Sequence, residues 1–202
     1  LVWFSAQAYL ATSINTPTLI TLPNTIFETG TRITPATPIS NKTELRETLQ
    51  AESGTDSLTE LELLSQTTKQ PLTATEFFAL LDATVDVNFS GSALGVSVGQ
   101  YHDAPWIVVQ TSDTATAQGG MLAWEDHLSN DLAPWFGERV HTDSKSGITL
   151  FHDGVIAAHD VRILTDKDGT ERVVYGFIAG NQLLITTNTT AFLNLSEKST
   201  KK

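Results

Sequence analysis

The stretch from Ala158 to Leu195 constrains the fold more than any other part of the chain. Two apolar runs flank Asp166-Lys167-Asp168-Gly169, and an Asp-Gly pair between such runs is typical of a hairpin turn with glycine at positive φ. A third apolar run, residues 182–187, follows Ala179-Gly180-Asn181, and a short helical pattern closes the chain. We therefore expect a β-meander capped by a helix, with the domain built around it.

A long amphipathic helix is predicted after Asp113, which can cap its first turn. An apolar stripe with helical spacing follows, made of Ala117, Met121, Trp124, Leu128 and Leu132. Three acids lie off this stripe, namely Glu125, Asp126 and Asp131. Pro134 is expected to end the helix or kink its last turn. Gly119-Gly120 falls inside the pattern, and we expect this pair to let the helix approach the sheet closely.

Caps and alternation predict the elements that come before this helix. Ser40 or Asn41 can cap a helix whose first turn contains Glu44. Residues 57–65 alternate with period two, which indicates a half-buried strand. Thr73-Ala74-Thr75-Glu76 is a capping box, and it predicts a further short helix ending near Ala83.

Further strands are predicted on both sides of the long helix. Residues 93–99 and 106–110 read as a hairpin whose connection, residues 100–105, is too long for a two-residue turn. Residues 148–151 and 155–157 are short strand candidates around His152-Asp153-Gly154. The fold class that follows is α+β: a mostly antiparallel sheet with a C-terminal β-meander, packed by one long and two or three short helices.

The N-terminal part of the chain has a different character. Residues 1–11 are uncharged and carry Trp3 and Tyr9, so they fit either the outer end of a membrane anchor or an ordinary packed segment. Residues 12–40 hold nine threonines, four prolines and only two charged residues. This composition predicts an extended arm, either a spacer or a surface arm packed on its own domain. We expect an N-terminal arm at residues 1–40, an α+β domain at 41–196 and a polar tail at 197–202.

Composition limits the classes of partner and the cellular location. A net charge of −11 and a pI near 4.7 argue against a nucleic-acid partner. The absence of cysteine excludes disulfides, thiolate metal sites and cysteine nucleophiles. Thirty threonines against twelve Lys and Arg favour an extracytoplasmic surface, in the cell envelope or at the cell surface.

The sequence contains only weak candidates for a catalytic or metal site. Four histidines stand next to or near an acid, as in His152-Asp153 and His159-Asp160, and such pairs occur in metal-dependent phosphohydrolases. Asp166 and Asp168 imitate the start of a calcium loop, although a hairpin turn explains them more simply. We expect no catalytic residue, no resident metal and no cofactor.

Three stretches resemble a known group of proteins: residues 113–136, 160–168 and 181–192. They resemble the extracytoplasmic C-terminal domain of uncharacterised membrane-anchored proteins of candidate-phylum (Patescibacteria-like) bacteria. The resemblance covers roughly residues 40–195. The matching positions are Trp124, Glu125, Asp131, Leu132, Pro134, Thr186 and Thr187. The resemblance implies a cell-envelope location with a membrane anchor upstream of the domain, and it implies no activity.

Three functional hypotheses follow. The first is a non-enzymatic envelope or surface protein that acts through protein–protein contacts, with residues 1–40 as a pairing arm in a surface assembly. The second is a metal-dependent hydrolase that uses His152, Asp153, His159 and Asp160. The third is an extracellular glycan- or peptide-binding module with Tyr101 and Trp106 near an exposed loop, although Trp106 is better explained as a core residue.

Overall fold

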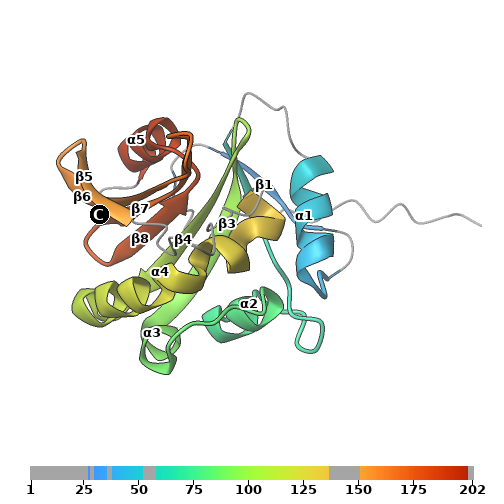
Figure 1. The fold of residues 1–202 in the computed structure, drawn as a ribbon. Helices are drawn as coiled ribbons and strands as arrows, with labels where there is room; N and C mark the ends of the chain where they lie inside the picture. Colours follow the sequence, from blue (N-terminus) through green and yellow to red (C-terminus); the bar gives the residue numbers. More distant parts are fainter. Residues whose placement is uncertain (1–26, 28–29, 36–37, 52–57, 137–150, 200–202) are drawn as a thin grey trace, which may run out of the picture.

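The computed structural model describes residues 27, 30–35, 38–51, 58–136 and 151–199, and every structural statement below concerns these residues. Eight strands form one sheet in the order β1-β2-β3-β4-β8-β7-β6-β5, and only the β1–β2 pair is parallel (Figure 1). The strands are β1 (Thr31–Ile33), β2 (Leu58–Leu61), β3 (Ala93–Tyr101), β4 (Ala104–Thr111), β5 (Phe151–Ile156), β6 (His159–Thr165), β7 (Glu171–Ala179) and β8 (Gln182–Thr186). The helices are α1 (Lys42–Ala51), α2 (Ala74–Leu80), α3 (Val87–Ser92), α4 (Thr114–Phe136) and α5 (Thr189–Lys198).

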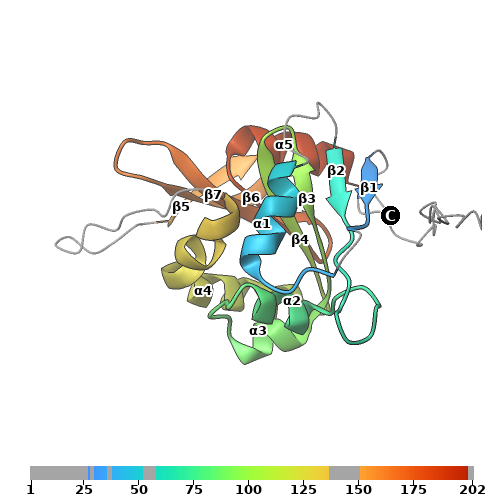
Figure 2. The ribbon, with the colours of Figure 1, turned by 90° about the vertical axis from the view of Figure 1, so that its right-hand side faces the viewer.

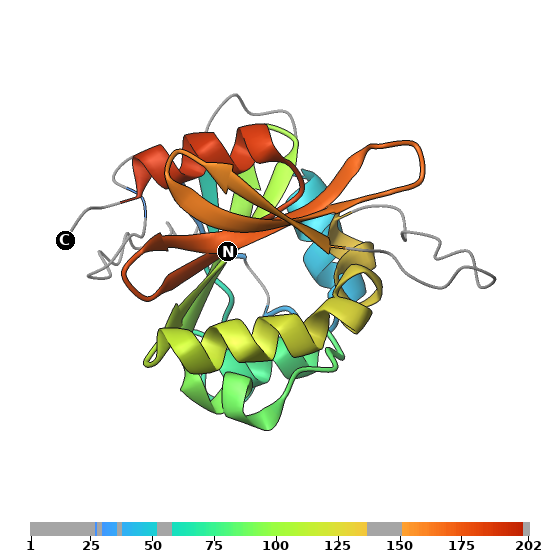
Figure 3. The same ribbon diagram turned by 60° about the vertical axis from the view of Figure 1, so that its left-hand side comes forward.

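Helices cover both faces of the sheet. The core on one face joins α1, α2, α3 and α4 to the sheet, whereas the core on the other face is closed by α5 (Figure 3). The central strands β4 and β8 are buried on both faces as a result, and Ile107, Val108, Leu184 and Ile185 are fully buried. The predicted α+β class with a mostly antiparallel sheet and one long helix is confirmed.

The C-terminal meander is confirmed. Strands β6, β7 and β8 pair in succession, and the turn between β6 and β7 places Gly169 at a φ of 78°. Gly180 has a φ of 54° in the turn between β7 and β8. The side chain of Asn188 accepts a hydrogen bond from the Ala191 N–H at 2.8 Å and so caps α5, which then packs back on the sheet.

The long helix is also confirmed. Asp113 accepts a hydrogen bond from the Thr116 N–H at 2.6 Å, and all five residues of the predicted stripe are buried. Pro134 does not end the helix, which continues to Phe136. Trp135, in that last turn, is buried in the core, so packing holds the helix beyond the proline.

The Gly119-Gly120 pair serves a different contact from the one expected. A β-carbon at Gly120 would collide with the Phe89 side chain of α3, whereas one at Gly119 would meet nothing within 4 Å. The close approach is therefore between α4 and α3 rather than between α4 and the sheet. Helix α3 itself was not predicted from the sequence, and its local signal is Asp86, whose side chain accepts a hydrogen bond from the Asn88 N–H.

Alanine substitutions at the two glycines should change stability in opposite directions. Gly120→Ala should lower the free energy of unfolding by about 1–3 kcal/mol, because the new methyl group forces α4 away from Phe89. Gly119→Ala should raise it by up to about 1 kcal/mol through helix propensity alone. Urea unfolding followed by circular dichroism measures both, and equal effects at the two positions would contradict the assigned contact.

Three local predictions on the strands are wrong. The β3–β4 hairpin closes through the two-residue turn His102-Asp103, because the strands extend to Tyr101 and Ala104. Pro105 is tolerated within β4 because the pairing with β8 begins only at Trp106, so no ladder bond there needs its missing N–H. All four residues of β2 are buried, so this strand is covered on both faces rather than half-buried.

The third correction concerns β5. His152-Asp153-Gly154 lies inside one continuous strand, and the turn falls at Ala157-Ala158, with φ values of 50° and 65°. Alanine rarely adopts this left-handed conformation, so two successive alanines carry no local signal for a turn. Residues 148–150 lie outside the described residues.

Part of the N-terminal arm belongs to the domain. Strand β1 pairs in parallel with β2, and Phe27 packs edge-on against Trp106 with ring centroids 5.0 Å apart. Phe27 also forms a β-bridge with Ser199, just after α5. Of the two alternatives for the arm, Phe27 and β1 therefore fit the surface arm that packs on its own domain. Residues 1–26 lie outside the described residues.

Candidate interaction site

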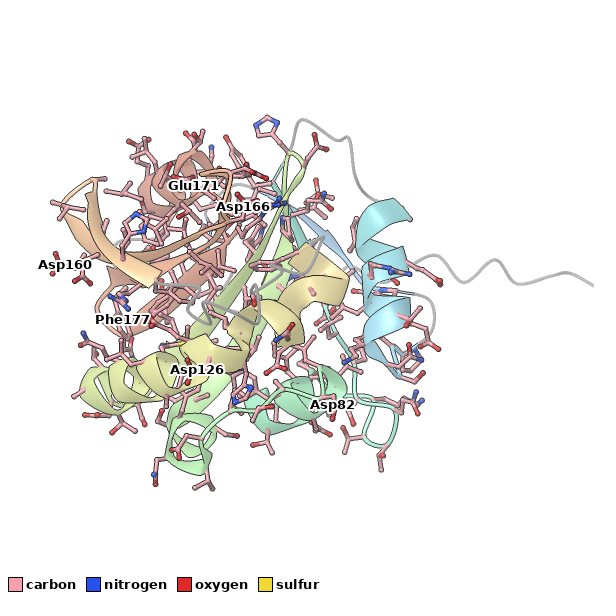
Figure 4. The ribbon with its side chains drawn as sticks, in the orientation of Figure 1. Asp82, Asp126, Asp160, Asp166, Glu171 and Phe177 are labelled. Atoms are coloured by element: carbon pink, nitrogen blue, oxygen red, sulfur yellow. The ribbon has the colours of Figure 1, made fainter. Side chains whose placement is uncertain are left out.

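The structure spreads the predicted histidine and aspartate candidates over separate places. His152 and Asp153 are successive residues of β5, so their side chains point to opposite faces of the sheet. The His159 ring lies 6.2 Å from that of Phe192. Asp160 is near the start of β6 and Asp166 just beyond its end, and Figure 4 shows the two well apart. Within the described ranges, no group of three or more His, Asp or Glu side chains is placed to hold a metal ion.

Asp166 organises the turn between β6 and β7. Its side chain accepts hydrogen bonds from the N–H groups of Asp168 and Thr170, at 2.9 and 3.0 Å. The guanidinium of Arg172 adds bonds of 2.9 and 2.6 Å to the second carboxylate oxygen. These bonds, from Arg172 first, hold the pKa of Asp166 below its usual value. The hairpin interpretation of the calcium-like sequence is thus confirmed.

The lowered pKa of Asp166 predicts how acid affects stability. A carboxylate whose pKa is lower in the folded state stabilises the fold above its unfolded pKa of about 3.9, and this contribution is lost as pH falls through the folded pKa. Asp166→Asn should therefore be less stable than the wild type at neutral pH, and this difference should shrink below about pH 4. Urea unfolding from neutral pH to pH 3 tests it. Asp168→Asn is the control, because only the backbone N–H of Asp168 bonds to Asp166. If the stability difference between Asp166→Asn and the wild type stayed the same at every pH, the stabilising role assigned to the Asp166 carboxylate would be wrong.

A polar cluster fastens α4 to the meander. Both nitrogens on one side of Arg162, Nε and Nη2, donate to the Glu125 carboxylate at 2.8 Å, and the Tyr175 hydroxyl donates to it at 2.6 Å. The third bond of Arg162 goes to Asp153 at 3.0 Å. Glu125 raises the pKa of Arg162, and burial together with Glu125 raises that of Tyr175, so both groups remain protonated donors. The cluster is satisfied within itself, and we assign it to helix docking.

Strand β2 pairs only with the second half of β3. The register runs from Leu58 opposite Tyr101 to Leu61 opposite Val98. Leu63 is the residue that would next face β3, but its carbonyl accepts the N–H of Leu72 at 2.9 Å instead. The chain turns back there through a bridge between Leu64 and Pro71, and Figure 2 shows β2 ending while β3 continues towards α3. The part of β3 that precedes Val98 therefore has no β2 residue opposite it.

A hollow of about 220 Å³ opens at this point, and we call it the β3 hollow. Its apolar lining comes mainly from the core on the α2 side, and its polar lining from β1, from β2 and the residue after it, and from the middle of β3. The lining residues are Arg32, Glu60, Leu61, Glu62, Leu63, Pro71, Leu72, Phe77, Val96 and Ser97. Exposure rises along the same strand, since Val98 is buried, Val96 is half-buried and Leu94 is 65% exposed. The hollow and the unpaired strand edge thus form one continuous surface.

The charged residues of the hollow are one ion pair and one further carboxylate. Arg32 Nη2 lies 3.1 Å from Glu60 Oε2, and the Thr34 hydroxyl donates to Glu62 at 2.7 Å. The buried Nε of Arg32 has no hydrogen-bond partner in the described part of the chain. The site therefore offers an apolar half, a polar half with one ion pair and one hydrogen-bonded carboxylate, and a backbone edge. This combination suits an extended peptide better than a reacting small molecule.

The aromatic pair proposed for glycan binding does not form a platform. Trp106 is fully buried against Phe27, as expected for a core residue. Tyr101 stands at the hairpin tip, with the His102 ring 4.4 Å away and Lys198 Nζ 5.9 Å from its centroid. One half-buried tyrosine leaves no paired stacking surface.

Comparisons with protein-family models, with curated proteins and with solved structures found no match to the chain. The resemblance to membrane-anchored proteins therefore stays a prediction. Among the described residues, no helix combines the length and apolar character needed to cross a bilayer. Residues 1–11, which fit either the end of an anchor or an ordinary packed segment, lie outside those residues.

Proposed function

We propose that the protein is a non-enzymatic domain of the cell envelope or cell surface that acts through protein–protein contacts, including self-association. The observation that carries the proposal is the unpaired edge of β3 next to the β3 hollow. An exposed strand edge presents backbone donors and acceptors, and adding a strand is the common way in which proteins use such an edge. The pairing arm of this proposal is residues 1–26, because the chain from Phe27 onwards packs on its own domain.

Composition supports the envelope location. The chain carries thirty threonines and only twelve basic residues, a balance more usual outside the cytoplasm than inside it. Residues 1–26 contain no charged side chain and include two of the four prolines of the N-terminal arm. Such a segment is suited to join a domain to a membrane or to a neighbouring subunit.

Self-association should depend on residues 1–26. We expect the full chain to form dimers or larger species with rising concentration in sedimentation velocity, and a variant lacking residues 1–26 to remain monomeric. The truncation stops before Phe27 because this side chain fills the core beside Trp106. Strictly monomeric behaviour of both chains would contradict self-association, and equal association of both would exclude residues 1–26 from the contact.

The location can be tested separately from association. In intact cells of the native organism, externally added protease should degrade the protein while a cytosolic marker survives, because an extracytoplasmic domain is exposed without lysis. Lysed cells serve as the control, in which both proteins should be degraded. Survival of the protein until lysis would contradict the envelope location.

A further inference from the structure

The turn that closes the β3–β4 hairpin fixes the direction in which each residue of β3 points its backbone N–H and C=O groups. The two-residue turn makes Tyr101 and Ala104 a hydrogen-bonded pair, and bonding direction then alternates along the strand. Gln100, Val98 and Val96 consequently direct their N–H and C=O groups away from β4. Thr59 and Leu61 of β2 face the first two, whereas no residue of β2 faces Val96. Val96 is therefore the point at which an added strand would pair.

The lining of the β3 hollow defines the side chains that such a strand should carry. A residue paired with Val96 places its side chain on the same face as Val96, which is the face of Leu63, Leu72 and Phe77. Its two neighbours point to the opposite face, towards Ser97 and the Arg32–Glu60 pair. The fitting strand has an aliphatic residue at its centre and carries no charge, since a charge would compete with the pair already present.

The chain contains such a strand in its own N-terminal segment. Residues 1–26 are uncharged, and Thr18-Leu19-Ile20-Thr21-Leu22 alternates between two faces with Ile20 at its centre. An uncharged donor also suits a chain with a net charge of −11, because two copies repel each other wherever their acidic surfaces meet.

The course of β1 favours a second copy over the same chain as the donor. Strand β1 runs parallel to β2, so the chain before Thr31 leaves at the end of β2 that pairs with Tyr101, opposite the β3 hollow. Phe27 lies beyond that end, on the α5 side of the sheet. To enter its own hollow, the segment would have to turn back along the whole of β2, with only residues 23–26 between Leu22 and Phe27 to do so.

We infer that residues Thr18–Leu22 of one copy add as a strand to Val96 of a second copy and place Ile20 in its β3 hollow. The inference rests on the proposed self-association and names its acceptor. Each copy then supplies one donor segment and one acceptor edge. Two copies that exchange segments form a closed dimer, and copies that pass the segment on in one direction form a chain.

Two matched proline variants of the full chain test the acceptor. Val96→Pro removes the N–H that faces the incoming strand. Val155→Pro removes an outward-facing N–H at the free edge of β5, where no strand is proposed to add. Both valines follow a glycine, so the residue before each proline is equally unrestricted. We expect Val96→Pro to raise the dissociation constant of self-association at least about tenfold, and Val155→Pro to leave it unchanged. Sedimentation velocity measures both, after circular dichroism has confirmed the fold.

A mixing experiment separates loss of the acceptor from general damage to the fold. Ile20→Glu disables the donor segment but leaves the β3 hollow intact, whereas Val96→Pro leaves the donor intact. At a protein concentration between the dissociation constants of the wild type and of the variants, we expect each variant alone to be monomeric. An equimolar mixture should form a heterodimer there, because one variant supplies the donor and the other the acceptor.

Several outcomes would overturn the inference. One is unchanged association of Val96→Pro, and another is a mixture that stays monomeric. If association depends on residues 1–26 but not on Val96, the proposed self-association stands and its acceptor lies elsewhere. If the wild type is monomeric and Ile20→Glu lowers its stability, the segment occupies the hollow of its own chain.

Discussion

The indole of Trp124 is the point at which α2, α3 and α4 meet above the sheet. Its ring packs against Phe78 and Phe89, with centroid distances of 5.8 and 6.3 Å. Its N–H donates to Asp131 at 2.7 Å, and the same carboxylate oxygen accepts the N–H of Thr84 at 2.8 Å. One buried ring and one acid thus connect the segment after α2 to the long helix. Because a buried indole N–H needs a partner, Asp131 lets this ring lie deep in the core without an unsatisfied donor.

The rest of the molecule follows from covering the sheet on both faces. Helix α4 closes one face through its apolar stripe and is fastened to β6 and β7 by Glu125. Helix α5 closes the other face, where its Phe192 lies in the same core as Trp106. Because helices cover the central strands on both faces, a partner protein can reach the backbone of the sheet only at unpaired strand edges. The interruption beside Val96 is the margin at which backbone groups and an apolar hollow coincide, because Leu63 pairs with Leu72 rather than with β3.

Features encoded by neighbouring residues were predictable from the sequence. The stripe of α4, the capping box from Thr73 to Glu76 and the Asp-Gly turn at Gly169 each involve residues within a few positions of one another. The predictions failed where the local signal was misleading. His152-Asp153-Gly154 resembles a turn but lies in an edge strand, and Ala157-Ala158 forms a turn with residues that normally avoid it.

The sequence by itself determined the α+β class, the order of most elements and which faces of the helices are apolar, because periodicity and caps act over one or two turns of chain. Only the tertiary structure decided which residues meet across the sheet. It gave Glu125, which the sequence placed simply off the stripe, its partners Arg162 and Tyr175, at sequence separations of 37 and 50 residues. It also decided that the β3 hollow forms among β1, β2 and β3, in the half of the sheet away from the C-terminal meander. That hollow depends on where two distant segments stop pairing, and no local pattern records this.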